Sequence, residues 1–290
     1  MHRRICLILC FVLLMTGWTA SFAQATEIQA APLVQASTKN GMVRVHLSSM
    51  GDPTEMDITV AGSYTADGNH DMTLTSGETL HIDFDKSTGQ ITMVRNGQRY
   101  AMGQAMALRR HAAKGSNGLR IAQTRMPDNL YPGDLHLTAQ RSGSSWRLYA
   151  IVHVYIEYYL YGVVPYEMSS SWPSEALKAQ SVAARTYTLN RMNGRSSYTY
   201  DLVDTSSDQV YNGYVGSVTN ATRAVDATRG IVIMNSGKLS GTYYTASNGG
   251  QTEAARSLGL TQVQVSRKEK KILQTLRCGN NQLTELLTNY

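Results

Sequence analysis

Apolar and polar residues alternate along several short segments in the first half of the chain. Residues 42–47, for example, read Met-Val-Arg-Val-His-Leu. Such runs, bounded by turn residues as in Asn96-Gly97, predict strands joined by hairpins. The predicted strands lie at 42–47, 56–60, 80–84, 91–94, 134–137 and 146–151, with a polar loop over 111–118. Residues 26–40 are polar and predict a poorly structured lead-in.

The alternation gives way to helical patterns near Ile156. A short helix is predicted over 157–164, before a turn at Pro165. A second, longer helix is predicted to start near Pro173, with its cap at Ser171 or Trp172, and to end near Met192. Its small residues, spaced like Ala179 and Ala183, allow another backbone to approach closely. A strand over 230–234, a turn over 235–238 and a partner strand over 242–246 follow.

These elements predict an α+β fold. A β-rich N-terminal part precedes a region in which a long Ala-rich helix packs on antiparallel strands. The sequence shows no internal repeat.

Residues 1–25 match the three parts of a secretory signal peptide. A short positive head is followed by an apolar run over 5–15 and by small residues up to Ala25. The run is shorter than the roughly 20 residues of a membrane-spanning helix. We therefore expect an exported chain, with an uncleaved N-terminal anchor as the alternative.

Charge and cysteine content exclude two kinds of site. The net charge is +6, but Arg3 and Arg4 carry two of these charges, and the segment after residue 255 has six Lys and Arg against two Glu. The body between is neutral, which argues against nucleic-acid binding. Removal of the signal would leave Cys278 alone, so no intrachain disulfide and no cysteine-based zinc site is expected.

Three motifs carry the candidate chemistry. The first is Gly162-Val-Val-Pro-Tyr-Glu167-Met, followed by Trp172-Pro-Ser-Glu-Ala-Leu-Lys-Ala-Gln180 on the long helix. The others are Gln209-Val-Tyr-Asn-Gly and Ser247-Asn-Gly-Gly-Gln-Thr-Glu. In this order and spacing they resemble the SpoIID/LytB family, over about 131–253.

The resemblance implies an enzyme that cuts cell-wall glycan strands, a sporulation-type peptidoglycan lytic transglycosylase, or a stimulator of a cell-wall amidase. Together with the residue patterns, it leads us to expect a signal peptide (1–25), a β-rich part (26–125), a SpoIID/LytB-like catalytic region (126–255) and a basic tail (256–290). The tail does not resemble the family, so it is either a shortened or frameshifted end or a genuine variant.

The resemblance also implies that Glu167 is the catalytic residue. Its neighbours are mostly apolar, and desolvation raises the pKa of a carboxyl, which then donates a proton at neutral pH. The alternatives for Glu167 are a helix cap or a pair with Arg185. Glu175, in a first helical turn, and Glu157 are weaker candidates.

Further residues are expected around Glu167 through the resemblance. Amides, hydroxyls and aromatic rings suit a sugar, and the chain has 17 Tyr against 3 Phe. The alternative is that Arg185 and the glycines are purely structural. The predicted substrate-binding residues are Gln180, Arg185, Gln209, Tyr211, Ser247, Gly249 and Gly250.

No metal or cofactor is expected. Some family members carry Cys and His-Cys ligands where this chain has Val203, Ser207 and Asp208. Asp204 and Asp208 alone would make a poor zinc site. If the metal is structural in those relatives, other packing must hold this loop.

The predicted reaction is non-hydrolytic cleavage of the MurNAc-GlcNAc bond, which leaves 1,6-anhydro ends. It needs one acid/base, because the muramic C6 hydroxyl attacks its own C1. The alternatives are a non-enzymatic peptidoglycan-binding stimulator of an amidase, and a hydrolase with Asp204 or Asp208 as second carboxylate. Glycan strands, and an amidase or other envelope protein, are the expected partners.

Overall fold

A computed structural model describes residues 28–30, 41–68, 70–112, 117–217, 219–235, 237–242 and 244. The predicted signal peptide, the basic tail and all three cysteines lie outside the described residues. So do three predicted site residues, Ser247, Gly249 and Gly250.

Strands make up the first half of the described chain, as the alternation predicts. In β3, for example, Met56, Ile58 and Val60 are buried while the residues between them are not. The strands are β2 (Met42–His46), β3 (Glu55–Ala61), β4 (Tyr64–Asp67), β5 (Met72–Leu74), β6 (Thr79–Phe84), β7 (Ile91–Arg95), β8 (Gln98–Gly103), β9 (Ala105–Arg110), β10 (Gly118–Ile121), β11 (Asp134–Ser142), β12 (Ser145–Tyr155) and β13 (Leu202–Val203), with a 3₁₀ turn η1 (Ser48–Met50) after β2.

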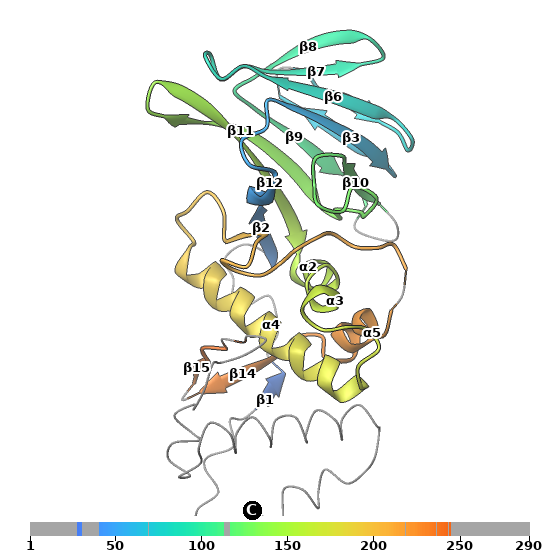
Figure 1. The fold of residues 1–290 in the computed structure, drawn as a ribbon, viewed down its shortest axis with the longest axis vertical. Helices are drawn as coiled ribbons and strands as arrows, with labels where there is room; N and C mark the ends of the chain where they lie inside the picture. The colour runs from blue at the N-terminus through green and yellow to red at the C-terminus, as the bar shows by residue number, and fades with distance from the viewer. Residues whose placement is uncertain are drawn as a thin grey trace, which may run out of the picture.

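These strands form two sheets that bury their apolar sides. One has the order β10-β3-β6-β7-β8 and the other β13-β2-β12-β11-β9-β4-β5. The second sheet takes strands from both sides of residue 125, because β11 and β12 pair with β9 and β2. In Figure 1 the strands fill the upper part and the helices lie below them.

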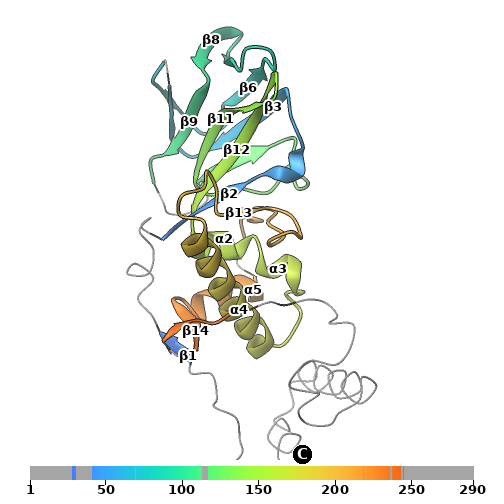
Figure 2. The ribbon, with the colours of Figure 1, turned by 90° about the vertical axis from the view of Figure 1, so that its left-hand side faces the viewer.

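The helices begin where β12 ends. They are α2 (Ile156–Tyr161), α3 (Val164–Glu167), α4 (Ser174–Gly194) and α5 (Asn220–Ala227). Figure 2 shows β12 leading directly into α2. Pro165 lies in the first turn of α3, where a missing N–H costs nothing.

The predicted ends of the long helix are corrected by one to two residues. Pro173 itself is the N-cap of α4, in place of Ser171 or Trp172. Its φ of −52° and ψ of 141° are those of a residue that precedes a helix. Gly194 is the last helical residue, and Arg195 caps the end.

A third sheet lies against α4. It has the order β1-β14-β15, with β1 at Ile28–Ala30, β14 at Ile231–Asn235 and β15 at Lys238–Leu239. The expectation that 26–40 lacks structure is wrong for Ile28–Ala30, which pairs with β14. After the turn, β15 pairs with β14 at Lys238–Leu239. The predicted partner strand over 242–246 lies mostly outside the described residues, which include only Thr242 and Tyr244 of it.

The small-residue face of α4 is covered only in part, because Ala179 is exposed and Ala183 is half-buried. Thr242 donates a hydrogen bond to the carbonyl of Ala183 (2.9 Å), and Asn190 donates one to the carbonyl of Ser240 (2.6 Å). The segment after β15 therefore runs along α4. Together with the sheets, this confirms the α+β class. None of the helices in the described part of the chain is long and apolar enough to cross a membrane.

Candidate functional site

Glu167 is the last residue of α3 and is exposed. Protein atoms nevertheless surround part of its carboxyl group, and this desolvation raises its pKa, while a hydrogen bond from the backbone of Val210 lowers it. Desolvation is the larger effect, so the pKa of Glu167 is raised above its ordinary value. An exposed acid with a raised pKa is the arrangement that a proton donor needs.

The segment from Gln209 to Gly213 lies beside Glu167. Gln209 is buried, and its Oε1 accepts hydrogen bonds from Tyr159 (3.1 Å) and Thr188 (2.8 Å). Its Nε2 donates to the phenol oxygen of Tyr244 at 2.7 Å. Gln209 thus joins α2, α4 and Tyr244, and the next residue, Val210, supplies the N–H for Glu167.

Gly162 is packed against the same segment. A Cβ at Gly162 would lie 2.6 Å from a ring carbon of Tyr211 and 2.8 Å from the carbonyl oxygen of Gly213. The amide of Asn212 also donates to the carbonyl of Gly162 at 3.2 Å. Only a glycine therefore lets the link between α2 and α3 approach this loop so closely.

Tyr244 is a site residue that the sequence did not single out. Burial raises the pKa of its phenol, the hydrogen bond from Gln209 lowers it, and the charge of Glu167 adds to the increase. Its ring also lies 6.5 Å, centroid to centroid, from that of Tyr187 on α4. It lies three residues before the Ser247 motif, in a segment that the sequence predicted only as a strand, although the high tyrosine content was a signal.

Two predicted substrate-binding residues lie in the interior of the protein. Arg185 is fully buried and forms a bidentate ion pair with Glu157, with Nε–Oε1 at 2.9 Å and Nη2–Oε2 at 2.7 Å. Tyr211 is also fully buried, with its ring against those of Tyr131 and Tyr159. Because both side chains are buried, we expect them to support the fold around the site rather than to contact a sugar.

The other candidates differ in position. Gln209 is buried, and among the described residues its amide donates to the phenol oxygen of Tyr244. Gln180 is half-buried, and its Nε2 is enclosed without a hydrogen-bond partner among the described residues. Its role in substrate binding stays a prediction. Glu175 is exposed and pairs with Lys178, and Glu157 is occupied by Arg185.

Asp208 holds the loop at which some family members carry metal ligands. One of its carboxylate oxygens pairs with Arg191 and accepts from the Tyr187 phenol (3.2 Å). The other pairs with Arg195 (3.2 Å) and accepts the N–H of Val203 (2.9 Å). In the described part of the chain, no three His, Cys, Asp or Glu side chains gather as a metal site would require.

An exposed acid beside buried amide and phenol groups, on an α+β scaffold, defines a candidate acid/base site. Comparison with known proteins identifies the region. The family model described as stage II sporulation protein, SpoIID, matches residues 144–235. The resemblance to the SpoIID/LytB family is therefore confirmed for this region, which contains Glu167 and the Gln209–Gly213 loop.

Two curated relatives match part of the chain. An uncharacterized protein of Brachyspira hyodysenteriae (strain ATCC 49526 / WA1) is 42% identical over 104 residues, which cover 36% of this chain. The amidase enhancer of Bacillus subtilis (strain 168) is 40% identical over 129 residues, or 43% of this chain. The matches span 28% and 17% of those two proteins.

Proposed function

We propose that this chain cleaves the glycan strands of peptidoglycan as a lytic transglycosylase, with Glu167 as general acid and then general base. The observation that carries the proposal is the exposed Glu167 carboxyl, whose pKa desolvation raises, in a SpoIID-family region. Its partial desolvation favours the neutral acid before reaction, and the Val210 N–H supports the anion after proton donation.

The proposed reaction is balanced with one carboxyl group. Glu167 gives its proton to the glycosidic oxygen as the bond from muramic C1 to that oxygen breaks. The C6 hydroxyl of the same muramic residue attacks C1, and its proton passes to Glu167. The product has a 1,6-anhydro end, the acid is regenerated, and no cofactor takes part.

The positions of the nearby carboxylates favour this reaction over hydrolysis. A glycosidase needs a second carboxylate that is free to act as nucleophile or base. Asp208 is 2% exposed and bound by two arginines, and Asp204 accepts hydrogen bonds from Ser48 and Ser49. The carboxylates of Asp204 and Asp208 are thus engaged in contacts that stabilise their own loop. Our proposal therefore uses Glu167 as the reactive acid.

Product analysis tests the proposal. Peptide-free glycan strands are incubated with the protein, and the ends are identified by mass spectrometry. We expect 1,6-anhydro ends, and a loss of cleavage of about 10²–10⁴-fold in Glu167→Gln, the usual contribution of a general acid. Glu175→Gln is the matched control, because Glu175 is 74% exposed and pairs only with the neighbouring Lys178 among the contacts we describe. Reducing ends, or full activity in Glu167→Gln, would refute the mechanism.

The similarity to a protein named amidase enhancer supports a second candidate function. The chain would bind glycan strands and stimulate a cell-wall amidase without cutting them. A purified amidase is assayed with and without this protein. Stimulation that persists in Glu167→Gln, without anhydro ends, would favour this second function.

The place of action is also part of the proposal. Peptidoglycan lies outside the cytoplasmic membrane, and the predicted signal peptide over residues 1–25 is consistent with export to the cell envelope. Secretion of the full chain by a host cell, with sequencing of the mature N-terminus, tests both cleavage and the alternative of an uncleaved anchor.

A further inference from the structure

The phenol of Tyr244 takes part in a hydrogen bond as the acceptor. Its oxygen lies 2.7 Å from Nε2 of Gln209. The same Nε2 lies 3.3 Å from the backbone carbonyl oxygen of Ala184. A carbonyl oxygen can only accept, so this second contact fixes which end of the Gln209 amide is the nitrogen. Gln209 is therefore the donor toward Tyr244, and the phenol oxygen accepts.

The opposite end of the Gln209 amide is held as well. Its Oε1 accepts from the hydroxyls of Tyr159 (3.1 Å) and Thr188 (2.8 Å). The amide thus cannot turn over without losing bonds at both ends. A phenol has one O–H donor besides its acceptor oxygen. The hydroxyl hydrogen of Tyr244 therefore points away from Gln209, and it has no acceptor among the described residues.

One loop brings this unused donor and the candidate acid together. Gln209, which holds the phenol of Tyr244, directly precedes Val210, whose backbone N–H supports the Glu167 carboxylate. Glu167 is exposed at the end of α3, so its side chain can rotate without disturbing the core. The contacts of the described residues include no hydrogen bond between the two side chains, so the carboxyl must turn toward the phenol for one to form.

The phenol keeps its proton while the carboxyl titrates. Burial raises the pKa of Tyr244 above its ordinary value, the hydrogen bond from Gln209 lowers it, and the nearby charge of Glu167 adds to the increase. A carboxylate accepts an O–H hydrogen bond more strongly than a neutral acid does. The donor therefore suits the state of Glu167 that has given up its proton.

We propose that Tyr244 is a positioning residue for the acid, whose hydroxyl donates a hydrogen bond to the Glu167 carboxylate after Glu167 has protonated the glycosidic oxygen. The inference rests on the proposed function, because that function makes Glu167 the acid. The Val210 N–H and the Tyr244 O–H then hold the anion until the proton of the C6 hydroxyl returns to it. Tyr244 keeps its own proton throughout, so the reaction stays balanced with one carboxyl group.

The pKa of Glu167 measures this hydrogen bond directly. The full chain, isotope-labelled at its glutamate carboxyls, is titrated by NMR, and the Glu167 signal is identified by its absence in Glu167→Gln. Tyr244→Phe removes only the hydroxyl and should raise the pKa of Glu167 by about one pH unit, because a donor to the anion is lost.

The pH dependence of cleavage should change in the same variant. The fall of kcat/KM at high pH should move upward by about one pH unit, since Glu167 stays protonated to a higher pH. Cleavage on the low-pH plateau should decrease, because a weaker acid donates its proton less readily. A purely structural role of Tyr244 would lower activity without moving the pH profile.

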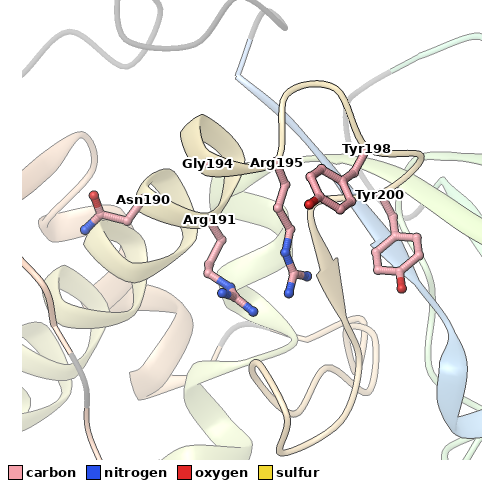
Figure 3. A pocket seen from close by; sticks show the side chains of 6 residues that line it. All are labelled: Asn190, Arg191, Gly194, Arg195, Tyr198 and Tyr200. Atoms are coloured by element: carbon pink, nitrogen blue, oxygen red, sulfur yellow. The ribbon is translucent and has the colours of Figure 1, made fainter.

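Matched variants separate the donated hydrogen bond from packing. Tyr159→Phe removes a phenol from the other end of the same buried amide and should leave the pKa of Glu167 unchanged. Tyr198→Phe should also leave it unchanged, because Figure 3 shows this 62% exposed ring beside Arg195, past the end of α4. If Tyr244→Phe folds poorly, a difluorinated tyrosine at position 244 keeps the shape of the ring. Its phenol is the stronger donor and should lower the pKa of Glu167.

An unchanged pKa of Glu167 in Tyr244→Phe or in the fluorinated variant, or an equal rise in Tyr159→Phe, would overturn the inference. The proposed function fails in a different way. In that case the wild-type protein forms no anhydro ends, while the pKa difference between wild type and Tyr244→Phe is still present.

Discussion

Replacing Arg185 by methionine should destabilise the protein strongly without a direct effect on glycan binding. Arg185 is 0% exposed, and its guanidinium meets both carboxylate oxygens of Glu157 at 2.9 and 2.7 Å. It also donates to the carbonyls of Ile231 (3.1 Å) and Val225 (3.2 Å). The change leaves a buried carboxylate without its counter-charge, which costs about 3–5 kcal/mol. That is a large part of the roughly 5–15 kcal/mol by which proteins are stable.

A second substitution separates the lost charge partner from the lost packing. Combining Arg185→Met with Glu157→Gln removes the uncompensated charge. The amide oxygen introduced by Glu157→Gln can still accept the N–H of Gly230, which lies 3.3 Å from the Glu157 carboxylate. We expect the double variant to recover about 2 kcal/mol relative to Arg185→Met alone. Lys178→Met breaks the exposed pair with Glu175 and should cost less than about 0.5 kcal/mol.

The free energy of unfolding is measured by urea denaturation, and glycan binding is measured under conditions in which each variant is folded. A loss below about 1 kcal/mol in Arg185→Met, or no recovery in the double variant, would show that the ion pair does not support the fold as we argue. Loss of glycan binding by a fully folded Arg185→Met protein would return Arg185 to the substrate-binding role that the family resemblance implies.

The contacts around the acid lead to three more predictions. Because the pKa of Glu167 is raised above 4.5 in the folded state, its contribution to stability is complete below pH 4.5 and is lost as pH rises through the raised pKa. In urea denaturation, Glu167→Gln should therefore be more stable than wild type at pH 7 and equally stable at pH 4. Equal stability at both pH values would contradict this direction of the pKa shift. Tyr244→Phe removes the hydroxyl that accepts a hydrogen bond from the Gln209 amide. It should lower the free energy of unfolding by about 1 kcal/mol and lower cleavage, measured by the yield of anhydro ends. Unchanged stability would show that this hydrogen bond does not stabilise the fold. Gly162→Ala should cost about 1–3 kcal/mol in urea, because its Cβ meets a buried ring at 2.6 Å; Gly194→Ala, with nothing within 4 Å, should be close to neutral.

The fold class could be predicted from the sequence because the spacing of hydrophobic residues in strands and in helices is a local property of each segment. Alternation over segments such as 42–46 fixes which face of β2 is buried, and the long run after Pro173 fixes α4. The pairing of Ile28–Ala30 with β14 could not be predicted in this way. That strand is three residues long and joins a partner about 200 positions away, so its stability comes from the tertiary fold rather than from its own sequence.

The location of the acid could likewise be predicted, but not the roles of the residues around it. Glu167 stood out through its apolar neighbours and the family motif. Tyr211 lies in the Gln209 motif and Arg185 follows the Trp172 motif on the same helix, and the structure buries both. A motif records that a residue is needed at a position, and a buried ring or ion pair that holds the backbone is needed as much as a group that touches the sugar.

The contacts between the Gly162–Glu167 segment and the Gln209–Gly213 motif explain why their spacing matters. Gly162 lies five residues before Glu167 in the chain. Its lack of a side chain leaves room for the ring of Tyr211, and its carbonyl accepts a hydrogen bond from the amide of Asn212. The N–H of Val210, in the same loop, supports the Glu167 carboxylate. The two segments are thus a single packed unit, in which the backbone of one sets the position and the pKa of the acid on the other. A change in that packing, even without contact with Glu167, would alter the pKa of the proposed proton donor. Under our proposed function, Gly162→Ala should therefore shift the pH dependence of cleavage as well as lower stability.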